Sequence, residues 1–356
     1  MGLILSIETS CDETAMALLE ARGGLRNPRF RIVKSAVLSQ IDIHKEFGGV
    51  VPNIAKREHA KALPLILKKF ERLSEFKKVN FIAVTVGPGL EPALWTGIEF
   101  ARALGEKTGK SIFAANHIMG HLYSFLLENP KNFKSLFPMV SLVVSGGHTI
   151  LFLLKSLDSV KKIGETRDDA AGEAFDKGAR LLGLPYPGGP ELERIALKGN
   201  ADSFDFPRPM LGQKNFDFSF AGLKTSLLYK LKESNKANWA DINRKVIAGK
   251  SRNLAEGFQA DIAASYEKAI VDCLVIKSFK AVEKFGARSV TISGGVSANK
   301  LLRKEFARAA KMRCLRFLAS DKKWSADNAA MIAASSYIEN LQGIKRKLAA
   351  DGNLAT

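Results

Sequence analysis

The sequence contains few cysteines: three among 356 residues, at Cys11, Cys273 and Cys314. Their number is odd and they lie far apart, which favours a reducing compartment over the oxidising one of disulfide-linked secreted proteins. No run of eighteen apolar residues is present, so no transmembrane helix is expected. The chain also begins without the basic head of a signal peptide and turns acidic at Glu8. We therefore expect a cytoplasmic protein with no membrane partner.

Proline is infrequent as well, at 12 residues, while 46% of the chain is hydrophobic. This composition excludes a linker or a disordered protein, and the length allows two substantial cores. Acidic residues are outnumbered, 36 against 54 lysines and arginines, which gives a formal net charge of +18. A surplus of this size favours a polyanionic partner, with nucleic acid ahead of an anionic membrane surface. Solvated lysine faces would explain any one basic cluster but less easily the total.

Histidine is scarce too, with five in the chain, yet two of them, His117 and His121, fall in one short run. The run follows an apolar stretch and is predicted to be helical, and on a helix this spacing places both imidazoles on one face. Two imidazoles so arranged can bind one metal ion. An isolated pair of this kind more often serves as a helix cap and a packing residue. A metal site therefore needs a third ligand from elsewhere in the chain.

An internal repeat predicts the architecture. Val84–Gly89 is similar to Val290–Gly295, and in each half a Phe-Ala-Arg-Ala segment begins thirteen residues after Gly87 or Ser293. A strand follows in both halves, and then a helix with polar groups near its start. We therefore expect an α/β protein of two similar lobes, each with hairpin strands first and parallel strands with helices after.

The predicted boundaries place the N-terminal lobe at residues 1–138 and the C-terminal lobe at residues 139–356. The second lobe carries an inserted segment at about 186–252, whose aromatic, turn-rich part and basic run Asn243–Arg252 are candidates for a substrate or RNA surface. The last helix could pack back on the first lobe. Corresponding turns of two such lobes are expected to face each other across a cleft.

The repeat also supplies a candidate third ligand, because Asp327 in the second half corresponds to the histidine pair in the first. We expect the two helices to meet at the cleft, where His117, His121 and Asp327 would complete a site for Zn²⁺ or Fe²⁺. Asp327 alone would more often be a helix N-cap. The turns Glu8–Thr14 and Ser145–Thr149 expose hydroxyl and backbone N–H groups that can bind an anion, although ordinary polar turns look the same.

A helix is predicted over residues 168–182, with Asp169, Glu173, Asp176 and Arg180 on one face. An acid-rich first turn is commonly explained by the helix dipole. Asp176 lies past that turn, so the dipole gives it little stabilisation.

A series of motifs makes the sequence similar to a known family. They are ETSCDET (Glu8–Thr14), GGVVP (Gly48–Pro52), GPGL (Gly87–Leu90), HIMGH (His117–His121), VSGGHT (Val144–Thr149), DDAAGEAFDK (Asp168–Lys177), YPGGP (Tyr186–Pro190), FSFAGLKT (Phe218–Thr225), SGGVSAN (Ser293–Asn299) and Asp327-Asn328. In this order, over nearly the whole chain, they resemble the TsaD (Gcp) family, the tRNA N6-adenosine threonylcarbamoyltransferases. The resemblance implies an actin-like, sugar-kinase/Hsp70-type (ASKHA) fold with two duplicated RNase H-like lobes around a cleft.

The resemblance also implies an activity and the residues that perform it. The family transfers a threonylcarbamoyl group from threonylcarbamoyl-adenylate to N6 of the adenosine 3′ of the anticodon, in tRNAs that read codons beginning with A. Carried over, Asp12 and Glu13 would face the reaction centre, and His117, His121 and Asp327 would hold the metal. The acyl-adenylate, or ATP or AMP, would contact these residues in the cleft: Val143, Val144, Ser145, Gly146, Gly147, Asp176, Gly189, Glu193 and Asn299. The family often has aspartate where Glu193 stands, a change of one methylene that still permits a hydrogen bond to ribose.

A cofactor and partners are implied in the same way. The cofactor would be one divalent metal ion per chain, iron first and zinc as the alternative. The partners would be tRNA, TsaB-like and TsaE-like proteins, and a TsaC-type enzyme that supplies the acyl-adenylate. Archaeal and eukaryotic relatives work in the KEOPS complex, but the short chain without a fused kinase domain favours the bacterial arrangement.

Three other functions compete with this interpretation. An ATP-dependent kinase or ATPase of the same fold would use magnesium alone and would not need His117 and His121. A zinc metalloprotease would need the glutamate of an H-E-x-x-H motif as its general base, and Ile118 stands in that position. A non-catalytic tRNA-binding scaffold fits the basic charge but leaves the site residues unexplained. We therefore predict metal-assisted acyl transfer to tRNA.

Overall fold

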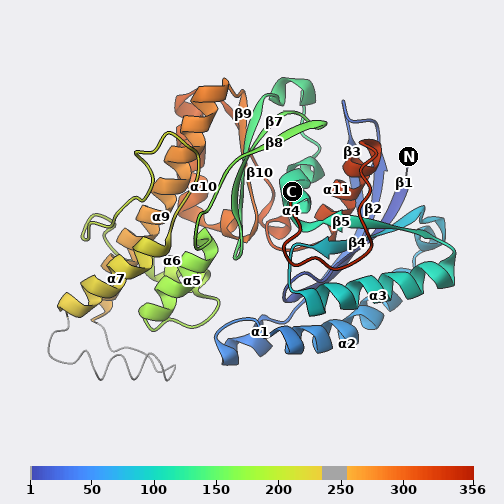
Figure 1. The fold of residues 1–356 in the computed structure, drawn as a ribbon, viewed down its shortest axis with the longest axis horizontal. Coiled ribbons are helices and arrows are strands. Elements are labelled where there is room, and N and C mark those ends of the chain that lie inside the picture. Colours follow the sequence, from blue (N-terminus) through green and yellow to red (C-terminus); the bar gives the residue numbers. More distant parts are fainter. Residues whose placement is uncertain (1, 235–254) are drawn as a thin grey trace. The chain divides into compact units, whose positions relative to one another are not determined.

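The computed structural model of the protein describes residues 2–234 and 255–356. The basic run Asn243–Arg252 and part of the insertion expected at about 186–252 lie outside the described residues. The chain forms two compact units, and Figure 1 labels their elements. Unit 1 consists of Met1–Phe137, Lys155–Val160 and Leu318–Thr356, and unit 2 of Pro138–Leu154 and Lys161–Phe317. Among the described helices, none combines the length and the apolarity that a membrane span requires.

Unit 1 is built on a five-stranded mixed sheet with the strand order β3-β2-β1-β4-β5 (Figure 1). Its strands are β1 (Gly2–Glu8), β2 (Glu13–Arg22), β3 (Arg29–Ser39), β4 (Phe81–Gly87) and β5 (Ser111–Asn116). Central strand β1 pairs antiparallel with β2 and parallel with β4. This order, hairpin strands first and parallel strands after, is the one that the sequence predicts.

Helices cover both faces of this sheet. They are α1 (Ile41–His44), α2 (Pro52–Glu71), α3 (Glu91–Thr108), α4 (His117–Tyr123) and α11 (Ala329–Leu341), with 3₁₀ turns at Lys45–Phe47, Ser74–Lys78, Ser124–Glu128, Phe133–Leu136 and Lys322–Trp324. Leu5 and Ile7 of β1 share one apolar core with α2 and α3. The Ser6 hydroxyl donates instead to the Ala329 carbonyl of α11 at 2.6 Å. Because side chains of a strand alternate between faces, Glu8 shares the face of Ser6.

Unit 2 repeats this topology, with the strand order β10-β9-β6-β7-β8. Its strands are β6 (Met139–Val144), β7 (Thr149–Ser156), β8 (Ser159–Glu165), β9 (Ser289–Ser293) and β10 (Arg316–Ala319). Strand β6 pairs antiparallel with β7 and parallel with β9, as β1 does with β2 and β4. The duplication predicted from the repeat is therefore present in the strand order itself. Strand β8 is not predicted from the sequence, because this edge strand is polar and largely exposed.

The helices of unit 2 are α5 (Ala171–Leu181), α6 (Gly188–Ala196), α7 (Ala221–Ser234), α9 (Glu256–Phe285) and α10 (Lys300–Met312), with a 3₁₀ turn at Gly295–Ala298. Helices α5, α6 and α10 pack against the long helix α9, which also contacts β6, and α7 packs against α5. The helix predicted from residue 168 begins at Ala171 instead. Asp168 precedes it and accepts the backbone N–H groups of Phe220 and Ala221, at 2.7 and 3.2 Å, where α7 begins. Asp168 therefore anchors α7 rather than extending α5.

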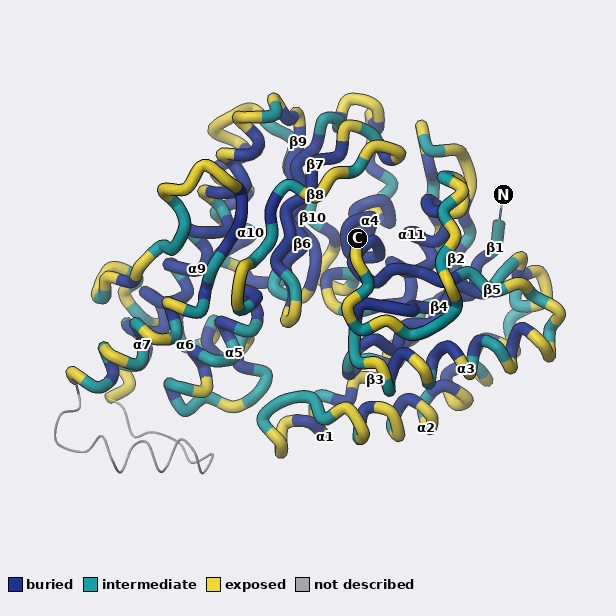
Figure 2. The backbone as a smooth tube through the Cα atoms, in the orientation of Figure 1, coloured by how far each residue is buried: buried dark blue, intermediate teal, exposed yellow. Residues whose placement is uncertain are grey.

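Helix α11 corrects the predicted lobe boundary. The sequence analysis assigns residues 139–356 to the second lobe, whereas Leu318–Thr356 belongs to unit 1. Residues Ala329 to Glu339 are all buried, so α11 needs apolar neighbours on every side (Figure 2). It finds them in α4 and in strands β1 and β2.

Candidate metal centre and nucleotide-binding residues

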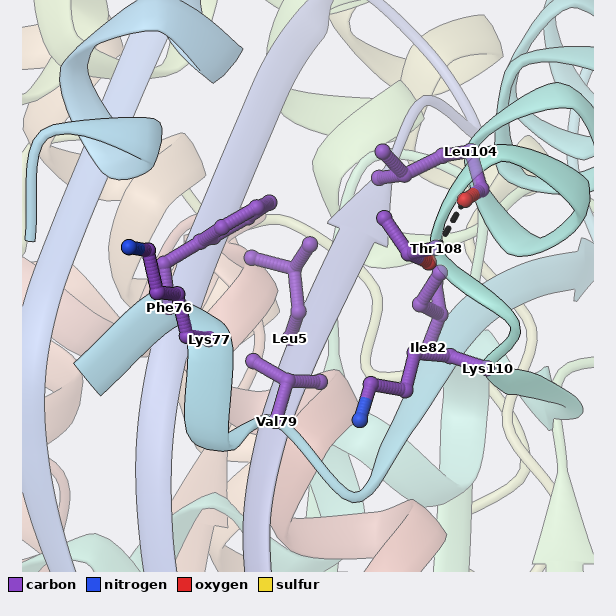
Figure 3. Close-up of a pocket in the computed structure, with 8 residues that line it drawn as sticks. All are labelled: Leu5, Phe76, Lys77, Val79, Ile82, Leu104, Thr108 and Lys110. Atoms are coloured by element: carbon purple, nitrogen blue, oxygen red, sulfur yellow. Dashed lines mark hydrogen bonds between the residues drawn. The ribbon is translucent and has the colours of Figure 1, made fainter. Parts of the chain in front are cut away.

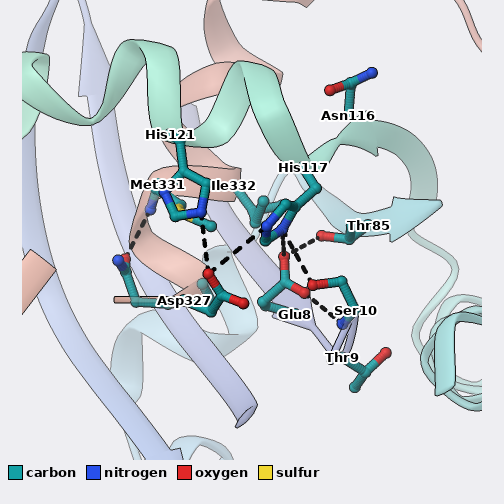
Figure 4. A network of polar contacts seen from close by, with 12 residues as sticks. Glu8, Thr9, Ser10, Thr85, Asn116, His117, His121, Asp327, Met331 and Ile332 are labelled. Carbon is teal, nitrogen blue, oxygen red and sulfur yellow. Dashed lines mark hydrogen bonds and ion pairs between the residues drawn. The ribbon is translucent and has the colours of Figure 1, made fainter. Parts of the chain in front are cut away.

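Helix α4 carries the histidine pair directly after strand β5 (Figure 4). Asn116 ends the strand and caps the helix, because its side-chain oxygen accepts the backbone N–H of Met119 at 3.1 Å. His117 is the first helical residue and His121 lies one turn later, so their rings meet edge to face with centroids 4.7 Å apart. Both side chains are buried. The structure thus has the two imidazoles on one helical face, as the spacing predicts.

Asp327 lies against this pair (Figure 4). Its Oδ1 atom is 3.0 Å from Nε2 of His121 and 3.6 Å from Nε2 of His117. One donor atom from each of the three residues lies within 4.8 Å of the others. Asn328 caps α11 by accepting the N–H of Met331 at 3.0 Å, which fixes the backbone beside Asp327. The three residues predicted as ligands are thus brought together, but all from unit 1 rather than from two lobes.

Gly120 explains how α4 and α11 come this close. A Cβ atom at Gly120 would lie 2.8 Å from Cδ1 of Ile332 and 3.2 Å from Cγ of Met331, both on α11. Real Cβ atoms do not approach other atoms so closely without displacing them. The glycine of the His-Ile-Met-Gly-His run therefore permits the helix contact that places Asp327 beside the histidines.

The donor set fits a divalent metal ion. Two imidazole nitrogens and one carboxylate oxygen are a ligand set found for zinc and for non-haem iron. Both Nε2 atoms approach Asp327, while Nδ1 of His117 lies 3.1 Å from a carboxylate oxygen of Glu8. A metal-bound histidine usually donates its second ring N–H to such an acceptor. His121 differs, because its buried Nδ1 atom has no hydrogen-bond partner within the described part of the chain.

Acidic side chains surround the histidines. Glu8 is fully buried and Asp12 is nearly so. Burial raises the pKa of Glu13 to about 10, and the carboxylates of Asp327 and Asp12 add to the rise. Burial alone would lower the pKa of His117, but the carboxylates of Asp327 and Glu8 outweigh it and raise that pKa to about 9. The predicted catalytic residues Asp12 and Glu13 therefore both lie in unit 1, and Glu13 is within electrostatic reach of Asp327.

The predicted acyl-adenylate residues lie in unit 2, and strand β6 carries the first of them. Val143 and Val144 are fully buried and paired within the sheet, so their side chains are not available to a ligand. The turn after β6 packs tightly on α5, because a Cβ at Gly172 would lie 2.5 Å from the carbonyl oxygen of Ser145. A Cβ at either position of Gly146-Gly147 would meet no atom within 4 Å. This part of the turn therefore presents its backbone at an open surface of unit 2.

Asp176 binds the start of helix α6. Its Oδ1 atom accepts the backbone N–H groups of Gly188 at 2.8 Å and Gly189 at 3.1 Å. Burial raises the pKa of Asp176, although these two hydrogen bonds oppose the rise. The predicted residues Asp176 and Gly189 are thus adjacent, and Asp176 has a helix-anchoring role that the sequence analysis does not predict.

Asn299 joins helix α10 to two acidic side chains. Its Oδ1 caps α10 by accepting the N–H of Leu302 at 2.8 Å. Its Nδ2 lies 2.6 Å from Oε1 of Glu267 and 3.5 Å from Oε2 of Glu193. The predicted residues Glu193 and Asn299 therefore meet, and Glu267 joins them although the sequence analysis misses it. A glutamate inside the apolar run of α9, between Tyr266 and Lys268, is the signal that could have identified it.

An apolar cavity of about 290 Å³ in unit 1 is separate from the metal-ligand group (Figure 3). Its lining combines six uncharged side chains with two lysines: Leu5, Phe76, Val79, Ile82, Leu104, Thr108, Lys77 and Lys110. These residues include the segments before β4 and β5, whereas the histidines follow the far end of β5. With no histidine, cysteine or carboxylate in its lining, the cavity is not a candidate for the chemistry.

Known proteins match both the sequence and the fold. A family model described as TsaD, tRNA N6-adenosine threonylcarbamoyltransferase, matches residues 31–334. The chain belongs to this family. A relative of that name from Thermosipho africanus is 41% identical over 96% of this chain and 96% of its own. Relatives of the same name from Thermosipho melanesiensis, 43% identical, and Ralstonia pickettii, 42% identical, cover 94% and 93% of this chain, and 94% and 89% of their own lengths.

Two solved structures share the fold at low identity. The crystal structure of T. kodakarensis HypF matches 96% of this chain and 48% of its own, with a TM-score of 0.62 and 14% identity. Full-length HypF in a phosphate- and nucleotide-bound form matches 98% of this chain and 47% of its own, with a TM-score of 0.59 and 12% identity. Together with the duplicated strand order, these likenesses confirm the predicted class, an actin-like α/β fold with two duplicated lobes.

Proposed function

We propose that this protein transfers the threonylcarbamoyl group from threonylcarbamoyl-adenylate to N6 of an adenosine in tRNA and releases AMP. The adenosine is the one 3′ of the anticodon in tRNAs that read codons beginning with A. The observation that carries the proposal is the meeting of His117, His121 and Asp327 in a chain of the tRNA N6-adenosine threonylcarbamoyltransferase family. The formal net charge of +18 supports a polyanionic substrate such as tRNA.

The proposed reaction is an acyl transfer. The N6 amine attacks the carbamoyl carbon and forms a C–N bond, the bond from that carbon to the phosphate oxygen breaks, and AMP leaves with the electron pair. The amine is a poor nucleophile because its lone pair is delocalised into the purine ring. Catalysis therefore requires polarisation of the carbonyl, stabilisation of the leaving phosphate and an acceptor for the N6 proton.

The metal ligands are proposed to be His117, His121 and Asp327, with iron as the ion and zinc as the alternative. A bound ion would supply Lewis-acid polarisation of the carbonyl and would offset the phosphate charge. The chain would contribute two imidazole nitrogens and one carboxylate oxygen, held on α4 and beside the start of α11. Asp327 keeps 19% of its side chain exposed, while the histidines are buried, so the carboxylate is the most accessible of the three.

Asp12 is proposed to accept the proton that N6 loses, and Glu13, which its pKa of about 10 keeps protonated at neutral pH, is proposed to contribute a hydrogen-bond donor beside it. Asp12 lies in the turn between β1 and β2, and Glu13 is the first residue of β2. The carbonyl of Asp12 accepts the N–H of Gln40 at 2.9 Å, which fixes the backbone of the turn. A carboxylate in a fixed, buried position can accept a proton without reorganising water around it.

The residues of unit 2 are proposed to bind the adenylate. Backbone N–H groups of Gly146 and Gly147 would contact its phosphate or the developing oxyanion, while the N–H of Ser145 donates to the His148 carbonyl at 2.8 Å and holds the turn. Asp176, Gly189, Glu193 and Asn299 would contact its adenosine and ribose. Two contacts support this assignment: the N–H of Gly189 donates to Asp176, and the amide of Asn299 approaches Glu193.

We further propose that TsaB-like and TsaE-like proteins assist, that a TsaC-type enzyme supplies the acyl-adenylate, and that the protein works in the cytoplasm.

A transfer assay tests the proposal. The purified chain is loaded with Fe²⁺ or Zn²⁺ and incubated with threonylcarbamoyl-adenylate, unmodified tRNA and the bacterial partner proteins. We expect one threonylcarbamoyladenosine per tRNA, detected by mass spectrometry of the nucleosides, and none with His117→Ala. Absence of modified adenosine with the intact chain would overturn the proposal. Hydrolysis of ATP with magnesium alone, at equal rates in His117→Ala, would favour the kinase-type alternative instead.

A further inference from the structure

Glu8 is a fully buried carboxylate to which the proposed function gives no role. It ends strand β1, and two donors hold it in place (Figure 4). The backbone N–H of Ser10 donates to its Oε1 atom at 2.5 Å, and the hydroxyl of Thr85 donates to its Oε2 atom at 2.7 Å. The same Oε2 atom lies 3.1 Å from Nδ1 of His117. A buried carboxylate with this many donors has one well-defined position.

The two ring nitrogens of His117 face different groups. Nδ1 faces Glu8 and the hydroxyl of Ser10, each at 3.1 Å. Nε2 faces Asp327 at 3.6 Å. Glu8 and Asp327 both carry carboxylates that accept hydrogen bonds, but only the Glu8 oxygen lies within hydrogen-bond distance, so the hydrogen of a neutral His117 sits on Nδ1. Its lone pair is then on Nε2, directed to the side where Asp327 and His121 lie.

His121 has no comparable support. Its Nε2 atom lies 3.0 Å from Asp327, but its buried Nδ1 atom is without a hydrogen-bond partner in residues 2–234 and 255–356. Packing of α4 on α11 must therefore orient this ring. The two histidines are therefore positioned by different means: Glu8 meets Nδ1 of His117, whereas no group among the described residues meets Nδ1 of His121.

We propose that Glu8 is the positioning residue of this metal centre and that Thr85 acts through it. Glu8 directs Nε2 of His117 toward the metal and raises the basicity of the ring by accepting its Nδ1–H. It acts through His117 rather than as a ligand, because it meets the ring nitrogen remote from Asp327 and is not among the three converging donors. The inference rests on the proposed metal binding but not on the proposed activity toward tRNA.

Metal affinity of the full chain tests this inference. Zn²⁺ alone is the probe, in competition with a chromophoric chelator, and Co²⁺ absorption reports the coordination geometry. We expect Glu8→Gln to weaken Zn²⁺ binding roughly 10- to 100-fold and to change the Co²⁺ spectrum. Thr85→Val should also weaken Zn²⁺ binding, but by less than Glu8→Gln does, because Glu8 keeps the hydrogen bond from the N–H of Ser10. Thr85→Ser restores the hydroxyl and should bind as the wild type does.

A matched control separates positioning from general stability. The hydroxyl of Thr14 contacts Nδ1 of His59 at 2.8 Å, and His59 is not one of the three converging donors. Thr14→Val should therefore lower the melting temperature of the metal-free protein without changing Zn²⁺ affinity. If Glu8→Gln does not fold, the Val and Ser variants of Thr85 decide the question.

Two results would overturn the inference. One is unchanged Zn²⁺ affinity with an unchanged Co²⁺ spectrum in Glu8→Gln and Thr85→Val. The other is an equal loss of affinity in Thr14→Val, which would make the effect one of general stability. If His117→Ala also binds Zn²⁺ as the wild type does, the proposed metal centre itself fails, and that failure is distinguishable from a failure of the role of Glu8.

Discussion

The side-chain amide of Asn299 donates to Oε1 of Glu267 over 2.6 Å and so joins the cap of α10 to the interior of α9. Glu193 lies on the other side of the same amide, with its Oε2 atom 3.5 Å from Nδ2. One amide therefore stands between two carboxylates in unit 2. Because both acids and Asn299 are buried or half-buried, the ionisation of this group affects the stability of the folded chain.

The first prediction concerns pH and Glu267. Burial raises the pKa of Glu267 to about 7, the hydrogen bond from Asn299 opposes the rise and the charge of Glu193 adds to it. The ordinary value is 4.5, so between pH 4.5 and 7 the folded state keeps a proton that the unfolded state has lost. The stability contributed by this group is full below pH 4.5 and is lost as the pH rises through 7.

The variant Glu267→Gln cannot ionise and should not show this loss. We expect its free energy of unfolding, relative to the wild type, to rise between pH 5 and pH 8 by up to roughly 3 kcal/mol. Urea unfolding at several pH values measures the difference. Glu256→Gln, at the exposed start of α9, is the control and should show no such trend. A pH-independent difference for Glu267→Gln would contradict the raised pKa.

The second prediction concerns Asp12 as the proton acceptor. Asp12→Asn keeps the size of the side chain but cannot accept a proton, so we expect kcat of threonylcarbamoyl transfer to fall about 10²- to 10⁴-fold. Zn²⁺ affinity should stay near that of the wild type, because Asp12 is outside the group of three donors. Glu13→Gln, at the next residue, is the variant to compare with Asp12→Asn in the same two measurements. Full turnover of Asp12→Asn would show that Asp12 does not take the proton.

The third prediction concerns the contact between α4 and α11. Gly120→Ala places a methyl group 2.8 Å from Cδ1 of Ile332, so we expect a loss of about 1–3 kcal/mol of stability and weaker Zn²⁺ binding. Ile332→Val removes that Cδ1 atom. The double variant Gly120→Ala with Ile332→Val should recover much of both losses, as measured by urea unfolding and chelator competition. Additive losses in the double variant would mean that this contact does not set the helix spacing.

Asp327 illustrates how much of the candidate site can be predicted from the sequence. The repeat relates its helix to the histidine helix, and that relation predicts correctly that Asp327, His117 and His121 are neighbours. The assignment of Asp327 to the second lobe is wrong, because residues 318–356 belong to unit 1. Helix α11 is apolar on all sides, so its sequence predicts burial but not the sheet against which it packs.

The sequence predicts neither the role of Glu8 nor the presence of strand β8, for different reasons. Strand β1 is buried on both faces, so no alternation of polar and apolar residues indicates which face Glu8 takes. Strand β8 is polar and lies at an edge, so no apolar pattern indicates a strand. The repeat could have predicted β8, because it holds the place in sheet order that β3 holds in unit 1.

The last prediction concerns the C-terminal segment, which lies along the turn after β4. The N–H of Asp351 donates to the carbonyl of Val86 at 2.8 Å, and Nδ2 of Asn116, the cap of α4, donates to the carbonyl of Ala355 at 3.1 Å. A Cβ at Gly87 would lie 2.0 Å from the Asp351 carbonyl oxygen. The segment therefore occupies the space beside Gly87 and contacts the N-cap of α4, the helix that carries the proposed metal ligands His117 and His121.

Deleting residues 351–356 should cost about 1–3 kcal/mol, since the backbone and Asn116 lose these partners. Gly87→Ala should destabilise the full chain and cost less in the shortened one, where the obstructing carbonyl is gone. The φ of 156° at Gly87 adds the same strain in both backgrounds, so it cancels in the double-mutant cycle. Gly49→Ala, where a Cβ would meet nothing within 4 Å, is the control. An equal loss of stability from Gly87→Ala in both chains would show that the C-terminal segment does not hold the turn. A smaller loss in the shortened chain, together with weaker Zn²⁺ binding, would show that the segment supports helix α4 through Asn116.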